Sequence, residues 1–165
     1  LETPRSEFRV PSSTGFDTVE FQFAPNPGEP ARPLRAIASS GEIARVMLAL
    51  KTVLAAEDEI PVLVFDEVDA GIGGRVADSV GERLKGLARE NQVLSVTHLP
   101  QIACFADHHY SVEKIERAGR TFTSVQYLAT DRERATELAR MLSGRRITDA
   151  VLEHAAAMLK QGARR

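Results

Sequence analysis

An apolar run that stops at two adjacent carboxylates constrains this chain more than any other feature. Residues Pro61 to Phe65 enter through a proline and carry four consecutive apolar side chains. A short run without alternation is typical of a strand that is buried on both faces of a parallel sheet. Asp66 and Glu67 follow at once, at the strand end where parallel sheets usually bind ligands. The sequence therefore predicts a buried strand with an acidic pair at its functional end.

The acidic pair suggests phosphate chemistry. Two neighbouring carboxylates should repel each other unless a cation or a reacting group separates their tasks. The pattern is that of a Walker B segment, in which Asp66 serves a Mg²⁺ shell and Glu67 a water that attacks a γ-phosphate. A strand that ends in solvated acids would look the same, so both interpretations stay open. Asp69 is ambiguous too, because Asp69-Ala70-Gly71 also favours an ordinary turn.

Composition excludes several classes of protein. The 165 residues can form one sizeable core, and their apolar and charged fractions, 43% and 27%, are ordinary for a soluble globular domain. A net charge of −2 does not support a large basic surface for nucleic acid. No apolar run approaches the roughly 20 residues of a membrane span, and the polar start lacks signal-peptide character. We therefore expect no membrane partner.

Other features of the sequence bear on its compartment and extent. Cys104 is the only cysteine, so a disulfide within one chain is impossible and a reducing cytoplasm fits. The chain begins without methionine, which suggests a piece of something longer. We expect an irregular lead-in at 1–16, a folded lobe at 17–162 and a short tail at 163–165.

Hydrophobic periodicity predicts alternating strands and helices. Alternation predicts a half-buried strand over 17–23, and the prolines of 24–33 predict a spacer loop. A helix should follow Gly41, with Ile43, Met47 and Leu50 on its apolar face. Further helices are predicted over 76–89, 131–142 and 147–161. Further strands are predicted over 92–97, 109–114 and 121–127. This order indicates an α/β fold.

Two further segments could meet a phosphate. Ser39 and Ser40 precede the first long helix, where free backbone N–H groups and the helix dipole favour an anion. Ordinary helix capping is the alternative. His98 ends the strand that should neighbour the acidic strand, and from there it could reach a phosphate or hold a water. The alternative is a surface histidine without a role.

Two nucleotide motifs fail on this sequence. The segment from Gly71 to Val76 begins like a dinucleotide fingerprint, but Val76 stands at the third glycine position and the acids precede the loop. No Gly-x-x-x-x-Gly-Lys-Ser/Thr segment occurs, so the loop that cradles phosphates in P-loop ATPases is missing. We therefore expect that the chain is not a whole P-loop ATPase.

Taken in order, the motifs resemble the C-terminal half of an ABC-type ATPase head of the SMC-like class, and most closely the RecN family of DNA repair proteins. The segments that carry this resemblance are Ala24–Pro30, Ile37–Lys51, Val64–Gly74 and Val96–Ala103. The resemblance implies an α/β, P-loop NTPase-like lobe with a mostly parallel sheet flanked by helices. It covers nearly the whole chain.

The resemblance also implies a role for each motif. The ABC signature corresponds to Ser39, Ser40, Gly41 and Glu42, which would contact the γ-phosphate of ATP held by an opposite head. Asp66 corresponds to the Walker B aspartate near Mg²⁺, and Glu67 to the general base that orients water. Asp69 corresponds to the D-loop residue, and His98 to the switch histidine that faces the γ-phosphate. One position departs from the family, which usually has glycine where Ser40 stands.

The expected partners follow from the same resemblance. They are the N-terminal half of the same head, a second head in a homodimer, and DNA through the full-length protein, which would be cytoplasmic and nucleoid-associated. ATPase activity is expected in the full-length dimer and not in this chain alone. Two alternatives remain: another ABC or SMC-like head, such as a transporter subunit, and a nucleotide-independent interaction domain that lost the activity.

Overall fold

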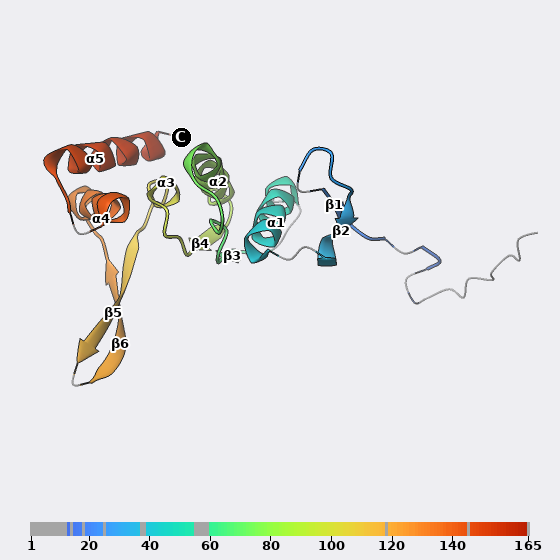
Figure 1. The fold of residues 1–165 in the computed structure, drawn as a ribbon, viewed down its shortest axis with the longest axis horizontal. Helices are drawn as coiled ribbons and strands as arrows, with labels where there is room; N and C mark the ends of the chain where they lie inside the picture. Colours follow the sequence, from blue (N-terminus) through green and yellow to red (C-terminus); the bar gives the residue numbers. More distant parts are fainter. Residues whose placement is uncertain are drawn as a thin grey trace, which may run out of the picture. The chain divides into compact units, whose positions relative to one another are not determined.

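The computed structural model in Figure 1 describes most of the chain after its first residues. The described residues are 13, 15–17, 19–24, 26–36, 39–54, 60–117, 119–144 and 146–164. Contacts divide the chain into two compact units, Leu1–Ala38 and Ser39–Arg165. Most of the predicted lead-in at 1–16 lies outside the described residues.

The first unit holds a minimal antiparallel ladder. Strand β1 (Gln22–Phe23) pairs with β2 (Arg32–Pro33), and the 3₁₀ helix η1 (Leu34–Ala36) follows. The predicted strand over 17–23 is therefore real only at its end, and Phe21 is exposed rather than half-buried. The predicted spacer is wrong at Arg32–Pro33, because a proline is tolerated at the edge of such a short ladder.

The second unit is an α/β arrangement around one parallel strand pair. Helix α1 (Ser40–Leu54) is followed by strand β3 (Val62–Phe65), helix α2 (Gly74–Leu87) and strand β4 (Gln92–Ser95). The two strands pair in parallel, with Val64 opposite Leu94. This β-α-β order confirms the expected α/β character, because parallel neighbours need a crossover connection.

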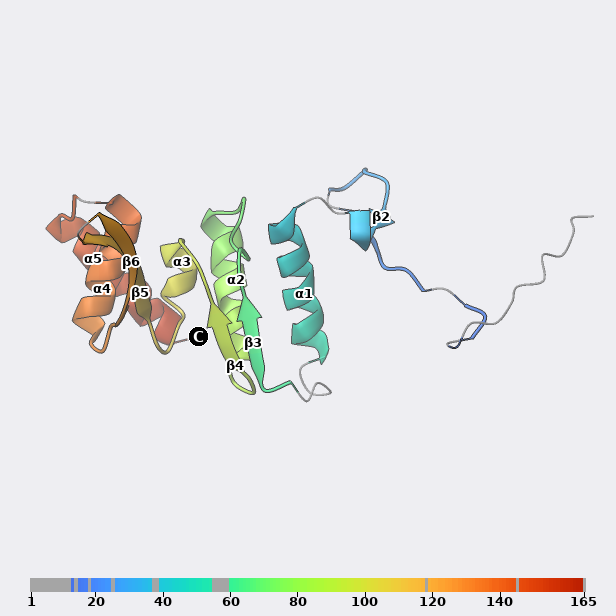
Figure 2. The ribbon, with the colours of Figure 1, turned by 90° about the horizontal axis from the view of Figure 1, so that it is seen from below.

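Helix α2 covers one face of the strand pair and leaves the other open. Leu63 and Phe65 point into the core, where they meet Leu48 of α1. The opposite face is visible in Figure 2, in which β3 and β4 lie in front of α2. Its side chains are aliphatic and exposed: Val62, Val64, Leu94 and Val96.

Two predictions of burial are wrong for this reason. The apolar run of β3 is buried on one face only, since Val64 retains 66% exposure. The apolar stripe predicted for α1 faces outward at Ile43 and Met47, whereas Leu48 fills the core. Both predictions assumed a cover that the described residues do not supply.

The C-terminal part adds a hairpin and two capped helices. The short helix α3 (Pro100–Ala103) leads to strands β5 (Tyr110–Arg117) and β6 (Arg120–Tyr127), which pair antiparallel. Helix α4 (Asp131–Ser143) then packs on α5 (Asp149–Ala163). Both begin after a threonine whose hydroxyl accepts a backbone N–H, a common start signal for helices.

Two glycines allow the helices to approach closely. A Cβ at Gly81 of α2 would lie 2.4 Å from the ring of Phe105. A Cβ at Gly162 of α5 would lie 2.3 Å from the backbone carbonyl oxygen of Cys104. Because the second neighbour is backbone, it cannot rotate away as a side chain could. The second core, built around Leu138 and Leu159, depends on this approach.

We therefore expect Gly162→Ala to lower the free energy of unfolding. Overpacking typically costs about 1–3 kcal/mol, and the better helix propensity of alanine offsets at most about 1 kcal/mol of it. Gly86→Ala in α2 is the matched control, because nothing lies within 4 Å of its added Cβ; it should be neutral or slightly stabilising. Urea unfolding measures both, and equal effects of the two substitutions would refute the close approach.

Candidate functional site

The turn after β3 presents its two acids outward. Asp66 and Glu67 are exposed, while the next two residues, Val68 and Asp69, are buried. Glu67 has φ 57°, the only positive value among the described residues other than glycine. Such a conformation costs on the order of 1–3 kcal/mol and persists only where the surroundings enforce it. Here the amide of Ala70 donates to the carbonyl of Glu67 at 3.0 Å and holds the turn.

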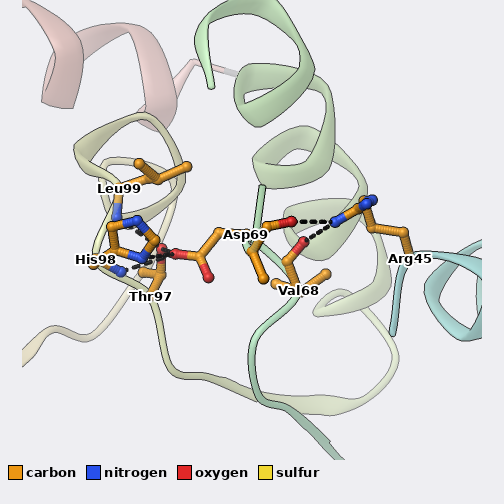
Figure 3. A network of polar contacts seen from close by, with 7 residues as sticks. Arg45, Val68, Asp69, Thr97, His98 and Leu99 are labelled. Atoms are coloured by element: carbon orange, nitrogen blue, oxygen red, sulfur yellow. Dashed lines mark hydrogen bonds and ion pairs between the residues drawn. The ribbon is translucent and has the colours of Figure 1, made fainter. Parts of the chain in front are cut away.

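Asp69 is the buried centre of a polar network (Figure 3). One of its oxygens, Oδ2, accepts from Thr97 Oγ1 at 2.6 Å and from the His98 amide at 2.9 Å, and His98 Nδ1 lies 2.9 Å from the same oxygen. Burial by itself would raise the pKa of Asp69, but the two hydrogen bonds and the nearby His98 ring together hold it below its ordinary value. Asp69 therefore stays ionised and ties the turn to the end of β4.

The same contact orients His98. A carboxylate only accepts hydrogen bonds, so this contact suits a ring with a proton on Nδ1; Nε2 is then an acceptor in the neutral ring and a donor when the ring carries both protons. The His98 side chain remains 72% exposed, whereas that of Asp69 is 4% exposed. His98 can therefore present Nε2 to a group outside the protein. Asp69, the residue expected in the D-loop, is buried itself, but the His98 side chain that it contacts is exposed.

The start of α1 is docked on the same turn. Gly41 permits this approach, because a Cβ there would lie 2.9 Å from the Cβ and the carbonyl oxygen of Ala70. Arg45 Nη1 donates to the carbonyl oxygens of Ala70 at 2.9 Å and of Val68 at 3.3 Å. Figure 3 shows Arg45 on the side of the turn opposite His98.

Two serines complete this junction. Ser39 Oγ accepts from the amide of Glu42 at 3.4 Å, as the residue before a helix commonly does. Ser40 Oγ donates to Glu67 Oε2 at 2.5 Å. The structure therefore brings together every residue that the sequence singled out: the Ser39–Glu42 segment, the turn from Asp66 to Asp69, and His98.

The arrangement is suited to a phosphate and a hard cation. Backbone N–H groups at the start of α1 attract anions, and His98 lies at the other end of the network. Asp66 is an exposed carboxylate, an oxygen donor of the kind Mg²⁺ prefers, and Mg²⁺ is commonly held by one or two carboxylates together with phosphate oxygens and waters. Among the residues that the structure describes, no group of three or more His, Cys, Asp and Glu side chains could hold a metal by itself. The donor set therefore fits Mg²⁺ only together with a bound phosphate.

Sequence reasoning missed two residues of the site. Arg45 and Thr97 join segments that are 23 to 28 residues apart in the chain. Neither has a local signal, because an arginine within a helix and a threonine at a strand end are ordinary. Only the tertiary contacts show that both stabilise the turn.

Cys104, in the second core, and His108, beside Tyr127 of β6, lie outside this site. Burial raises the pKa of the Cys104 thiol to about 11, so it is protonated at neutral pH. His108 Nδ1 lies 3.0 Å from the hydroxyl of Tyr127.

In the part of the chain that the structure describes, no helix is both long and apolar enough to cross a bilayer.

The sequence is similar to that of known proteins. No family model matches the chain. It is 50% identical to the DNA repair protein RecN of Treponema pallidum over 150 residues, which are 91% of this chain and 26% of that protein. The corresponding protein of Deinococcus radiodurans is 51% identical over 159 residues, 96% of this chain and 28% of the relative. That of Bacillus subtilis is 42% identical over 147 residues, 89% of this chain and 25% of the relative.

A solved structure is also similar, though weakly. It is described as "Structural biochemistry of ATP-driven dimerization and DNA stimulated activation of SMC ATPases" and has a TM-score of 0.49 at 23% identity, over 72% of this chain and 70% of that chain. The sequence relatives are far closer, and the chain spans about a quarter of their length. Over about nine-tenths of its length, the chain is therefore similar to a segment, about a quarter in length, of proteins described as DNA repair protein RecN.

Proposed function

We propose that this chain supplies one side of an ATP-hydrolysing site in a RecN-type protein that acts in DNA double-strand break repair and recombination. The observation that carries the proposal is the junction of α1 with the turn after β3. There Gly41, Arg45 and Asp69 hold the Ser39–Glu42 segment, the acidic pair and His98 in one place. The names of the sequence relatives support the assignment to DNA repair.

Each residue of the junction has a role in this proposal. Asp66 would hold Mg²⁺, and the ion would supply positive charge against the phosphate oxygens. Glu67 accepts the proton of the attacking water. His98, held beside Asp69, would face the γ-phosphate. When its ring carries a proton on both nitrogens, Nε2 would donate to the phosphate as negative charge builds up.

The Ser39–Glu42 segment serves a second nucleotide in this proposal. Backbone N–H groups at the start of α1 would bind the γ-phosphate of ATP that a second head holds. The assembly is thus a homodimer of heads with ATP between them. Hydrolysis removes the bridging phosphate, separates the heads and changes their hold on DNA.

Another part of the full-length protein completes each head. The 165 residues contain no phosphate-cradling loop, so we propose that the N-terminal half of the head provides it. The exposed aliphatic face of the strand pair, with Val64 and Leu94, supports this proposal. Parallel strands are normally covered on both faces. The outward apolar residues of α1, Ile43 and Met47, would be covered by the same partner.

The proposed binding to DNA and the proposed location in the cell depend on the full-length protein rather than on this chain. The net charge of −2 provides no general basic surface, so DNA would be bound through the full-length protein. A protein that repairs DNA would be cytoplasmic and associated with the nucleoid. Neither statement rests on a particular side chain of this chain.

The base assignment predicts the effect of Glu67→Gln in the full-length protein. ATP binding should persist, while turnover falls by roughly 10²-fold or more, because a positioned base typically supplies 10²–10⁴. ATP-bound dimers should accumulate. Phosphate release and light scattering measure the two effects, with Glu90→Gln, an exposed glutamate after α2, as the control. Normal turnover of the Glu67 variant would remove it from catalysis.

The role of the α1 start predicts a separate phenotype for Ser39→Arg. Nucleotide binding by a single head should be nearly unchanged, because the segment meets ATP on the other head. ATP-driven dimerisation and hydrolysis should be lost, since a long side chain blocks the approach of phosphate. Ser79→Arg on the exposed side of α2 controls for the added charge. If the Ser39 variant still dimerises and turns over ATP, the serine is only a helix cap.

A further inference from the structure

The hydrogen bond between Ser40 and Glu67 joins the two halves of the proposed mechanism within one chain. Ser40 Oγ and Glu67 Oε2 are 2.5 Å apart, although the residues are 27 positions apart in sequence. A hydroxyl that donates to an ionised carboxylate at this distance makes a charge-assisted bond, stronger than one between neutral groups. Ser40 belongs to the segment that would meet a phosphate of the second head, and Glu67 is the proposed base of its own head.

Ser40 is not needed to start the helix. Ser39 accepts the hydrogen bond from Glu42 N at the start of α1, while Arg45 and Gly41 dock the helix on the turn. The hydroxyl of Ser40 is therefore an addition to a junction that is already held. Among the residues that the structure describes, this hydroxyl donates to Glu67.

Glu67 leaves the turn in a fixed direction. Its backbone has φ 57°, a conformation that the contacts of Ala70 and Arg45 enforce around it. The side chain therefore starts from a constrained position. The bond to Ser40 then determines where the exposed carboxylate points.

A serine hydroxyl has one proton to donate. It can donate to Glu67 or to a phosphate oxygen, but not fully to both. A phosphate bound at the start of α1 would also bring negative charge towards the Glu67 carboxylate, and like charges so close repel each other. Phosphate binding there and the bond from Ser40 to Glu67 therefore oppose each other.

We propose that Ser40 is a latch that restrains the base of its own head until a phosphate on the second head takes its hydroxyl. The proposal rests on the proposed function above. While latched, the Glu67 carboxylate is held at Ser40 by the bond to Oε2 and does not turn towards the attacking water. Engagement of the second head frees it. In a symmetric dimer each head carries the same latch, so ATP bound by one head affects hydrolysis on the other.

The test compares ATP hydrolysis by the full-length protein over a wide range of ATP concentrations. The wild type should respond sigmoidally, with a Hill coefficient above 1. Ser40→Ala should lower the Hill coefficient towards 1 and raise the rate at low ATP by roughly 2- to 10-fold, as loss of one hydrogen bond allows. Ser40→Thr keeps the hydroxyl and should behave as the wild type. Ser79→Ala removes an exposed hydroxyl elsewhere and should change nothing.

Several results would overturn the latch. They are a hyperbolic response of the wild type, an unchanged response of Ser40→Ala, and a lower rate of Ser40→Ala at every ATP concentration with recovery in Ser40→Thr. The last result would mean that Ser40 aims Glu67 for catalysis instead of restraining it.

Glu67→Gln, measured alongside, separates the two proposals. If Glu67→Gln abolishes turnover while Ser40→Ala leaves the response unchanged, the latch alone fails. If the wild type does not hydrolyse ATP, or Glu67→Gln turns over normally, the proposed function fails and the latch fails with it.

Discussion

The buried carboxylate of Asp69 is the interaction on which the rest of the site depends. It is 3% exposed; one of its oxygens receives hydrogen bonds from Thr97 and the His98 amide and lies 2.9 Å from His98 Nδ1. A buried charge must be paired, because removing one partner of a buried ion pair typically costs about 3–5 kcal/mol. The end of β4 therefore cannot move independently of the turn after β3. On the other side, Arg45 fixes α1 to the carbonyls of the same turn.

This construction explains why the exposed residues can act together. Glu67, His98 and Ser40 are all exposed, and exposed side chains on separate loops would be poorly positioned. Here each projects from a backbone that buried contacts hold. Precise placement of reacting groups is worth several kcal/mol in catalysis, so the proposed role of Glu67 as a base would explain its strained backbone.

In the part of the chain that the structure describes, the strand pair β3–β4 is covered on one face only. One face of the strand pair is buried against α2, and the other exposes Val62, Val64, Leu94 and Val96. Contiguous exposed apolar side chains of this kind mark interaction sites. In the proposed function, the partner that covers this face also brings the phosphate-binding loop. Covering the sheet and completing the site would then be one event.

The sequence predicted the bounds of helices and strands better than the burial and contacts of their side chains. Periodicity placed α4 and α5 within two residues of their observed ends, because local capping and amphipathic patterns determine them. The acidic strand and His98 were placed at neighbouring strand ends for the same reason. The prediction that β3 is buried on both faces was wrong. The apolar sequence of Val62–Phe65 is the same whether or not another element covers its second face. The roles of Arg45 and Thr97 could not be predicted, because their partners are distant in sequence.

The central claim is that this chain carries one side of a composite nucleotide site and cannot hold ATP alone. Titration calorimetry of Mg-ATP into the 165-residue chain, beside the full-length protein, tests it directly. The account predicts binding in the micromolar range or tighter by the full-length protein and none in that range by the chain alone. Micromolar binding of Mg-ATP by the isolated chain would contradict the account.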